Sequence, residues 1–193
     1  MTAKSDAPHV GLVVEGSGDA GAVPLLLRRY LHGLGEFRDL LGKPVPCNGR
    51  ENALKPKGLE GYVATAAARP GCIAVIVVLD SEGDPVCRLG PSLTKRAEQV
   101  TQKPVLVSIA HESYGDWIVA SAETLGLGLN FQPGMNGLAA ISAALRPAKY
   151  VKPTWQPRLT QRIDIEVAAS RNASLHRFFA RFEDIIKAFR RAT

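Results

Sequence analysis

The sequence predicts an α/β fold with a mainly parallel central sheet and helices on both of its faces. Short, valine-rich apolar runs alternate along the chain with helical segments. Several of these runs are apolar without alternation, as buried parallel strands are. At 193 residues, with 46% hydrophobic and 22% charged residues, the chain has the size and composition of one globular domain. We therefore expect a single domain over residues 1–193, with a core at about 9–125 and an irregular, basic, helical part at about 126–193.

Three segments are predicted to be strands of this sheet. They read HVGLVVE at 9–15, CIAVIVVL at 72–79 and PVLVSIA at 104–110. The second segment is continuously apolar and β-branched, so we expect it to lie centrally in the sheet. Parallel strands joined by right-handed crossovers end at one edge of the sheet, where binding sites form in open α/β folds.

Helices are predicted between and after the strands. The proline- and glycine-rich stretch 33–58 is typical of a loop. Ser174 is a suitable N-cap for the last helix. The expected helices cover residues 22–31, 59–69, 92–102, 114–125, 138–145, 158–169 and 174–190.

The net charge of +6 is concentrated near the end of the chain. Residues 1–145 carry a net charge of −1, whereas residues 146–193 carry +7. A basic segment of this kind favours a polyanionic partner such as DNA or RNA, although a solvated helical face would have the same composition. Arg177 and Arg181 are four residues apart and share a helical face, which could contact nucleic acid or an acidic partner protein. The candidate nucleic-acid-binding residues are Lys152, Arg158, Arg162, Arg177 and Arg181.

Nothing in the sequence predicts contact with a membrane. No apolar run approaches the ~20 residues of a membrane-spanning helix. The polar start, residues 1–8, lacks the apolar stretch of a secretory signal. We therefore expect a cytoplasmic protein without membrane contact, and we leave open whether it forms a homo-oligomer.

Acidic residues follow two of the predicted strands. Glu15 closes the first strand, and Asp80, Glu82 and Asp84 lie directly after the central one. If these strands are neighbours, the carboxylates converge, and oxygen ligands without a cysteine or histidine partner suit Mg²⁺ or Mn²⁺. Such carboxylates repel one another, so without a cation some would be protonated. The structural alternative is that these acids only cap helices or solvate turns.

A second motif overlaps the first of these acids. Residues 16–21, GSGDAG, fit the GxGxxG pattern of a dinucleotide-binding turn between a strand and a helix. Two carboxylates, Glu15 beside the turn and Asp19 within it, would repel a pyrophosphate. No second strand that ends in an acid follows about 20 residues later, where a ribose-binding residue would lie. These features argue against nucleotide-cofactor binding.

A strand that ends in Glu15-Gly16, then a helix, then a strand that ends in the acidic turn at 80–84, resembles the TOPRIM domain. Four segments, in their order and spacing, resemble a narrower family of this type. They are VVEGSGDAG at 13–21, VVLDSEGDP at 77–85, DWIVAS at 116–121 and YVKPTWQ at 150–156. Across about residues 10–185 the chain resembles small bacterial TOPRIM-like proteins encoded beside ATPases in defence loci. These proteins are related to the overcoming-lysogenisation-defect nucleases.

The resemblance implies roles for the acidic residues. Glu15 would be the general base or a metal-coordinating residue, and Asp80 and Glu82 would be metal ligands with assistance from Asp84. The family's Asp-x-Asp has an aspartate where this chain has Glu82. Two further acids, Asp19 and Asp116, match accessory positions.

The resemblance also implies a function. We expect divalent-metal-dependent hydrolysis of phosphodiesters in DNA or RNA, by a nuclease or nuclease subunit of bacterial anti-phage defence. The cofactor would be Mg²⁺ or Mn²⁺. The alternative is a non-catalytic TOPRIM-like binding or signalling module that partners an ATPase.

Overall fold

The computed structural model describes residues 7–192, apart from the side chains of residues 189, 191 and 192. Most of the polar start that bears on secretion, residues 1–6, lies outside this range. Over the described part of the chain, no helix combines the length and the apolar character needed to cross a membrane.

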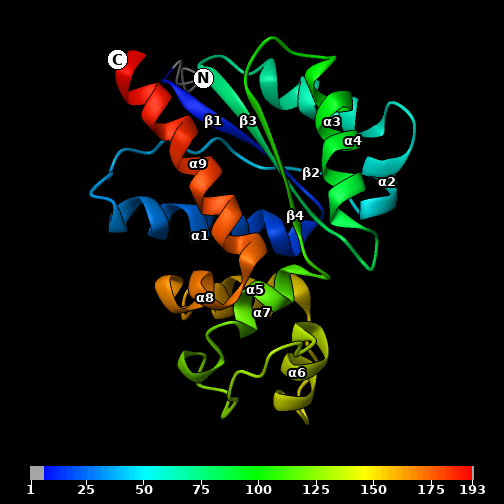
Figure 1. Cartoon of the computed structure of the whole chain (residues 1–193), viewed down its shortest axis with the longest axis vertical. Helices are drawn as coiled ribbons and strands as arrows, with labels where there is room; N and C mark the ends of the chain where they lie inside the picture. Colours follow the sequence, from blue (N-terminus) through cyan, green and yellow to red (C-terminus); the bar gives the residue numbers. More distant parts are fainter. Residues whose placement is uncertain (1–6, 193) are drawn as a thin grey trace, which may run out of the picture.

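A four-stranded parallel sheet forms the centre of the molecule (Figure 1). Its order is β2-β1-β3-β4, with β1 at His9–Val14, β2 at Val45–Pro46, β3 at Cys72–Asp80 and β4 at Val105–Ala110. The prediction of an α/β fold with a parallel sheet is confirmed, and the most apolar segment, β3, lies between β1 and β4 as expected. The two-residue strand β2 is not among the predicted strands.

Helices cover both faces of the sheet (Figure 1). On one face pack α2, α3 and α4, and on the other α1 and α9 with α5, α7 and α8 beyond the strands' carboxyl ends. The α-helices are α1 Ser17–Gly33, α2 Arg50–Leu54, α3 Gly58–Ala67, α4 Val86–Glu98, α5 Tyr114–Val119, α6 Gly137–Ala144, α7 Lys152–Thr160, α8 Ile165–Arg171 and α9 Ala173–Ala192. A short 3₁₀ turn, Ala122–Thr124, follows α5.

The two apolar clusters explain why β3 is apolar from Cys72 to Leu79. Side chains on a strand alternate between faces. Ile76 and Val78 pack in the cluster beneath α1 and α9, whereas Val75, Val77 and Leu79 pack in the cluster beneath α3 and α4. A strand buried on both faces needs no polar alternation.

The C-terminal helices differ from the prediction. In place of the single helix expected over 158–169, α7 ends at Thr160 and α8 begins at Ile165. The break is stabilised by Asp164, whose carboxylate accepts a hydrogen bond of 3.0 Å from the backbone N–H of Val167. Pro153 lies in the first turn of α7, where a backbone N–H has no helical partner, so proline is tolerated there.

The predicted N-cap of the last helix is also wrong. Asn172 precedes α9, and its Oδ1 accepts hydrogen bonds of 3.1 Å from the backbone N–H groups of Ser174 and Leu175. The hydroxyl of Ser174 instead accepts a bond of 2.7 Å from the Trp117 indole. Ser174 therefore ties α9 to α5.

Three other boundaries differ from the prediction because glycine and proline do not break these elements. Helix α1 begins at Ser17 and not at Ala22, since the Asp19 side chain bonds the backbone of Gly16. Helix α4 begins at Val86, and Pro91 lies inside it. The stretch 33–58, expected to be a loop, contains β2 and α2.

Helix α7 packs directly on the glycine-rich turn. A Cβ added to Gly18 would overlap Gln156 Oε1 and lie 3.1 Å from the backbone carbonyl carbon of Lys152. A Cβ added to Gly21 would lie 2.7 Å from the Pro157 ring. These glycines therefore make room for α7, which supports the interpretation that the GxGxxG pattern is no dinucleotide site.

We expect Gly18→Ala to destabilise the protein by about 1–3 kcal/mol, because the added methyl group forces α7 away from α1. Gly33→Ala is the matched control at the end of the same helix, since a Cβ added there would have no atom within 4 Å. That exchange should be neutral or slightly stabilising. Urea unfolding of both variants measures the difference, and equal stability of the two would contradict the close packing of α7.

Candidate functional site

Glu15 and Asp80 lie side by side at the carboxyl edge of the sheet. Strands β1 and β3 are parallel neighbours with Val14 opposite Val78, so the residues that follow them emerge together. The backbone N–H of Asp80 donates a hydrogen bond of 3.2 Å to Glu15 Oε2. The structure thus brings together these two sequence-predicted residues.

Asp19 joins them from the first turn of α1. Its Oδ2 accepts a hydrogen bond of 3.0 Å from the backbone N–H of Gly16, and its Oδ1 accepts one of 2.5 Å from Gln156 Nε2. The second contact comes from α7, which covers this edge of the site. Asp19 is one of the predicted accessory acids, and its electrostatic repulsion with Asp80 places it in the same cluster.

All three carboxylates are buried, with exposed fractions of 8% for Glu15, 4% for Asp19 and 4% for Asp80. Burial raises the pKa of each, because the charged form loses its hydration. The pKa of Asp80 rises furthest, to about 8, through burial first and then repulsion from Glu15 and Asp19. We call Glu15, Asp19 and Asp80 the buried acid cluster.

Lys152, at the start of α7, is the cation that faces the buried acid cluster. Its Nζ lies 3.7 Å from Asp80 Oδ2. Burial alone would lower the lysine's pKa, but attraction to Asp80 and the neighbouring carboxylates raises it on balance. Lys152 is one of the predicted nucleic-acid-binding residues, and its ammonium group lies where a substrate phosphate could approach these acids.

The other two predicted ligands, Glu82 and Asp84, lie in the exposed turn after β3. Both side chains are half exposed, and Glu82 adopts a positive φ of 48°. The Asp84 carboxylate accepts a hydrogen bond from the guanidinium of Arg50. Glu82 lies 3.9 Å from the same guanidinium. Glu82 also acts electrostatically on Glu15, so it borders the buried acid cluster.

Arg50 is the residue that sequence reasoning missed. It is only 8% exposed, and it donates hydrogen bonds of 3.1 Å and 3.0 Å to the carbonyl oxygens of Asp80 and Ser81. With its contacts to Asp84 and Glu82, it fixes the acidic turn against the sheet. Arg50 directly follows Gly49, in the turn after a strand, and such a place can indicate a site residue. The sequence gives little indication of that strand, because β2 has only two residues.

Asp116 does not join the buried acid cluster. Its Oδ2 accepts a hydrogen bond of 3.2 Å from the backbone N–H of Ser113, and its Oδ1 accepts one of 2.6 Å from that of Gly137. Both carboxylate oxygens are thus used to cap α5 and to hold the start of α6. The role of accessory acid predicted for Asp116 does not agree with this geometry.

The predicted basic residues lie in four different places. Arg158 lies over the ring of Trp155, with its guanidinium carbon 5.7 Å from the ring centre. Arg162, between α7 and α8, donates a hydrogen bond of 2.8 Å to the carbonyl of Leu125 and so ties this connection to the segment after α5. Arg177 and Arg181 line a separate pocket beside β4. Of the five predicted residues, Lys152 is the one that approaches the acids.

No family model matches the chain. No curated protein and no solved structure matches it either. The TOPRIM resemblance therefore stays a prediction, and a functional assignment has to come from the geometry of the site.

The chemistry of the donors suits a hard divalent cation, because the buried acid cluster and Glu82 supply carboxylate oxygens only. Their arrangement is not a preformed cage. Across residues 7–192, no three His, Cys, Asp or Glu side chains are grouped to hold a metal ion together. The cavity between Asp80, Lys152 and Gln156 measures only about 10 Å³. An ion would therefore require the half-exposed Lys152 side chain to move away from Asp80.

Gln156, which lines this cavity, carries a polar atom that bears on such a rearrangement. Gln156 is 1% exposed, and its Oε1 has no hydrogen-bond partner within the described part of the chain. A buried amide oxygen without a partner is costly. Gln156 can thus supply one more oxygen ligand, directly or through water, when a cation enters.

Proposed function

We propose that this protein is a TOPRIM-type nuclease or nuclease subunit that hydrolyses phosphodiesters in DNA or RNA with Mg²⁺ or Mn²⁺. The observation that carries the proposal is the buried acid cluster, in which Glu15, Asp19 and Asp80 lie together beside Lys152. Buried carboxylates with raised pKa values are typical of functional sites, because folding alone does not favour them. We further propose that the protein acts in the bacterial cytoplasm, in anti-phage defence.

The side chains divide the work of hydrolysis among them. A divalent ion bound by Asp80, Glu15 and Glu82 would stabilise charge on the phosphoryl group and lower the pKa of a bound water. Glu15, whose own pKa is raised by burial, is suited to accept a proton from the attacking water. Lys152 would bind a phosphate oxygen of the substrate once its ammonium group leaves Asp80.

A second candidate is a non-catalytic TOPRIM-like module that binds nucleic acid or a partner ATPase. One observation favours it: within the chain, Lys152 already pairs with Asp80 and Arg50 with Asp84. In that case the lysine and the arginine would be permanent structural counter-ions. The two candidates differ in whether a divalent cation binds.

Divalent cations are expected to raise the melting temperature of the wild-type protein. A cation that binds only the folded state, at a concentration about tenfold above its Kd, stabilises the protein by about 1.4 kcal/mol. For a chain of this size the melting temperature then rises by roughly 3–6 °C. The measurement is thermal unfolding in Mn²⁺ or Mg²⁺, with NaCl at matched ionic strength as the control for non-specific charge effects.

Asp80→Asn should abolish the shift, because it removes a ligand but keeps an oxygen that accepts the bond from the Tyr114 backbone. Asp116→Asn is the matched control at an acid outside the cluster and should keep the shift. The absence of a shift in the wild-type protein at millimolar metal would favour the non-catalytic module.

A further inference from the structure

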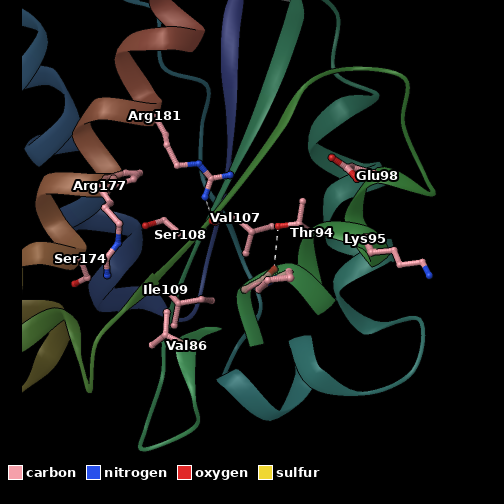
Figure 2. A pocket seen from close by; sticks show the side chains of 13 residues that line it. Val86, Thr94, Lys95, Glu98, Val107, Ser108, Ile109, Ser174, Arg177 and Arg181 are labelled. Atoms are coloured by element: carbon pink, nitrogen blue, oxygen red, sulfur yellow. Dashed lines mark hydrogen bonds between the residues drawn. The ribbon is translucent and has the colours of Figure 1, made fainter. Parts of the chain in front are cut away.

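A pocket of about 450 Å³ lies between α4 and α9, beside the outer strand of the sheet (Figure 2). Its floor is formed by Val107, Ser108 and Ile109 of β4. Its volume lies within the ~300–1,000 Å³ of ordinary ligand sites. None of its lining residues belongs to the buried acid cluster.

The backbone at this floor has an open hydrogen-bonding edge. The N–H of Val75 donates to the carbonyl of Pro104, just before β4, and the N–H of Ser81 donates to that of Ala110. The even-numbered residues of β4 therefore direct their backbone N–H and C=O groups toward β3. The odd-numbered residues, Val107 and Ile109 among them, therefore direct their N–H and C=O groups outward. Within residues 7–192 no strand pairs with β4 on that side.

The two residues nevertheless expose little surface to water. Val107 is 3% exposed and Ile109 is 5% exposed. A buried backbone group without a partner costs free energy. Arg181 Nη1 donates a bond of 3.2 Å to the Val107 carbonyl, so one outward group already takes a donor from outside the sheet.

The walls of the pocket combine positive charge with apolar surface. Arg181 reaches from α9 toward β4 in Figure 2 and Arg177 lies along α9 beside Ser174, whereas Lys95 and Glu98 lie on the α4 side. The three cations and one acid leave a net charge of +2 in the lining. Val86 adds apolar surface near the end of the floor.

We propose that this pocket binds an extended, acidic peptide segment of a partner protein, which adds to β4 as a fifth strand. The peptide backbone would pair with the outward groups of Val107 and Ile109. Its carboxylates would pair with Arg177 and Arg181, and alternate apolar side chains would contact Val86 and Ile109. Addition of a strand to an open sheet edge beside a helix is an established mode of peptide recognition.

The observations favour a peptide over a nucleic acid strand. A phosphate backbone would use the arginines and could accept bonds from the outward N–H groups, but it has no donors for the outward carbonyl groups and no partner for the apolar surface. A peptide satisfies all three features at once. The proposal does not depend on hydrolysis or metal binding at the acid cluster.

The test uses a fluorescein-labelled peptide of about six residues, the length of a typical strand, with alternating valine and glutamate. Fluorescence anisotropy with the full-length protein, without metal, should show saturable binding. Arg177→Glu should weaken binding by at least about tenfold, since it reverses a charge at the rim. Arg158→Glu, the same exchange on α7, should leave binding unchanged.

Two N-methylated forms of the peptide test the strand geometry. In one form every second backbone amide is N-methylated, and in the other form the remaining amides are. Only the form whose methylated amides would point toward β4 should fail to bind. Equal effects of the two forms, or no binding of the unmodified peptide, would overturn the proposal. Binding of an oligothymidylate that is lost in Arg177→Glu, without peptide binding, would identify the pocket as a nucleic-acid site instead.

Discussion

The metal-free protein is expected to lose stability as the pH rises from about 4 to about 8. The pKa of Asp80 is about 8 in the folded protein, against an ordinary value of 3.8 in the unfolded chain. Between these values the folded state holds a proton that the unfolded state has released, so the free energy of unfolding falls as the pH rises. The pKa values of Glu15 and Asp19 shift in the same direction. The loss ends above about pH 8.

Its size makes this effect measurable by urea unfolding. About four pH units at ~1.4 kcal/mol each set an upper limit of about 6 kcal/mol for Asp80 alone. Asp80→Asn should remove this contribution, so the variant should become increasingly more stable than the wild type toward pH 8. Parallel pH profiles of the two proteins would show that Asp80 is ionised at neutral pH in the folded state, contrary to its raised pKa.

Arg50→Ala is expected to destabilise the protein by about 3 kcal/mol. The exchange leaves the carbonyls of Asp80 and Ser81 without their donor and releases the carboxylate of Asp84. The acidic turn would then lose its attachment to α2. Chemical denaturation measures the loss, and the metal-induced stabilisation should weaken with it because Glu82 is no longer held near Asp80.

Arg88→Ala is the matched control for Arg50, since Arg88 is exposed on α4. Surface exchanges of this kind usually change stability by no more than about 0.5 kcal/mol. If both alanine variants were equally stable, the hydrogen bonds from Arg50 would not be what holds the turn.

The approach of Glu15 to Asp80 could be predicted from the sequence because it follows from two robust rules. Continuous apolar runs form parallel strands, and the residues after neighbouring strands emerge at one edge. The contacts made by Arg50 and Lys152 depend instead on where a two-residue strand and a proline-containing helix lie. Neither element has a periodic pattern long enough to be recognised.

The basic residues show a different limit of sequence reasoning. A local excess of charge does not say which way each side chain points. Arg162 binds a backbone carbonyl, and Arg177 and Arg181 line a pocket beside β4, whereas Lys152 faces the acids. The same excess of charge thus serves at least three purposes, which only the packing of α7 and α9 separates.

The most direct test of the central claim is cleavage of supercoiled plasmid and of labelled single strands in Mn²⁺. We predict cleavage by the wild-type protein, and a loss of at least about a hundredfold in both Glu15→Gln and Asp80→Asn, as expected when a general base or a metal ligand is removed. Cleavage that persists in both variants would place the activity elsewhere. No cleavage by the wild type, even with a candidate partner ATPase added, would contradict the nuclease assignment and leave the binding module.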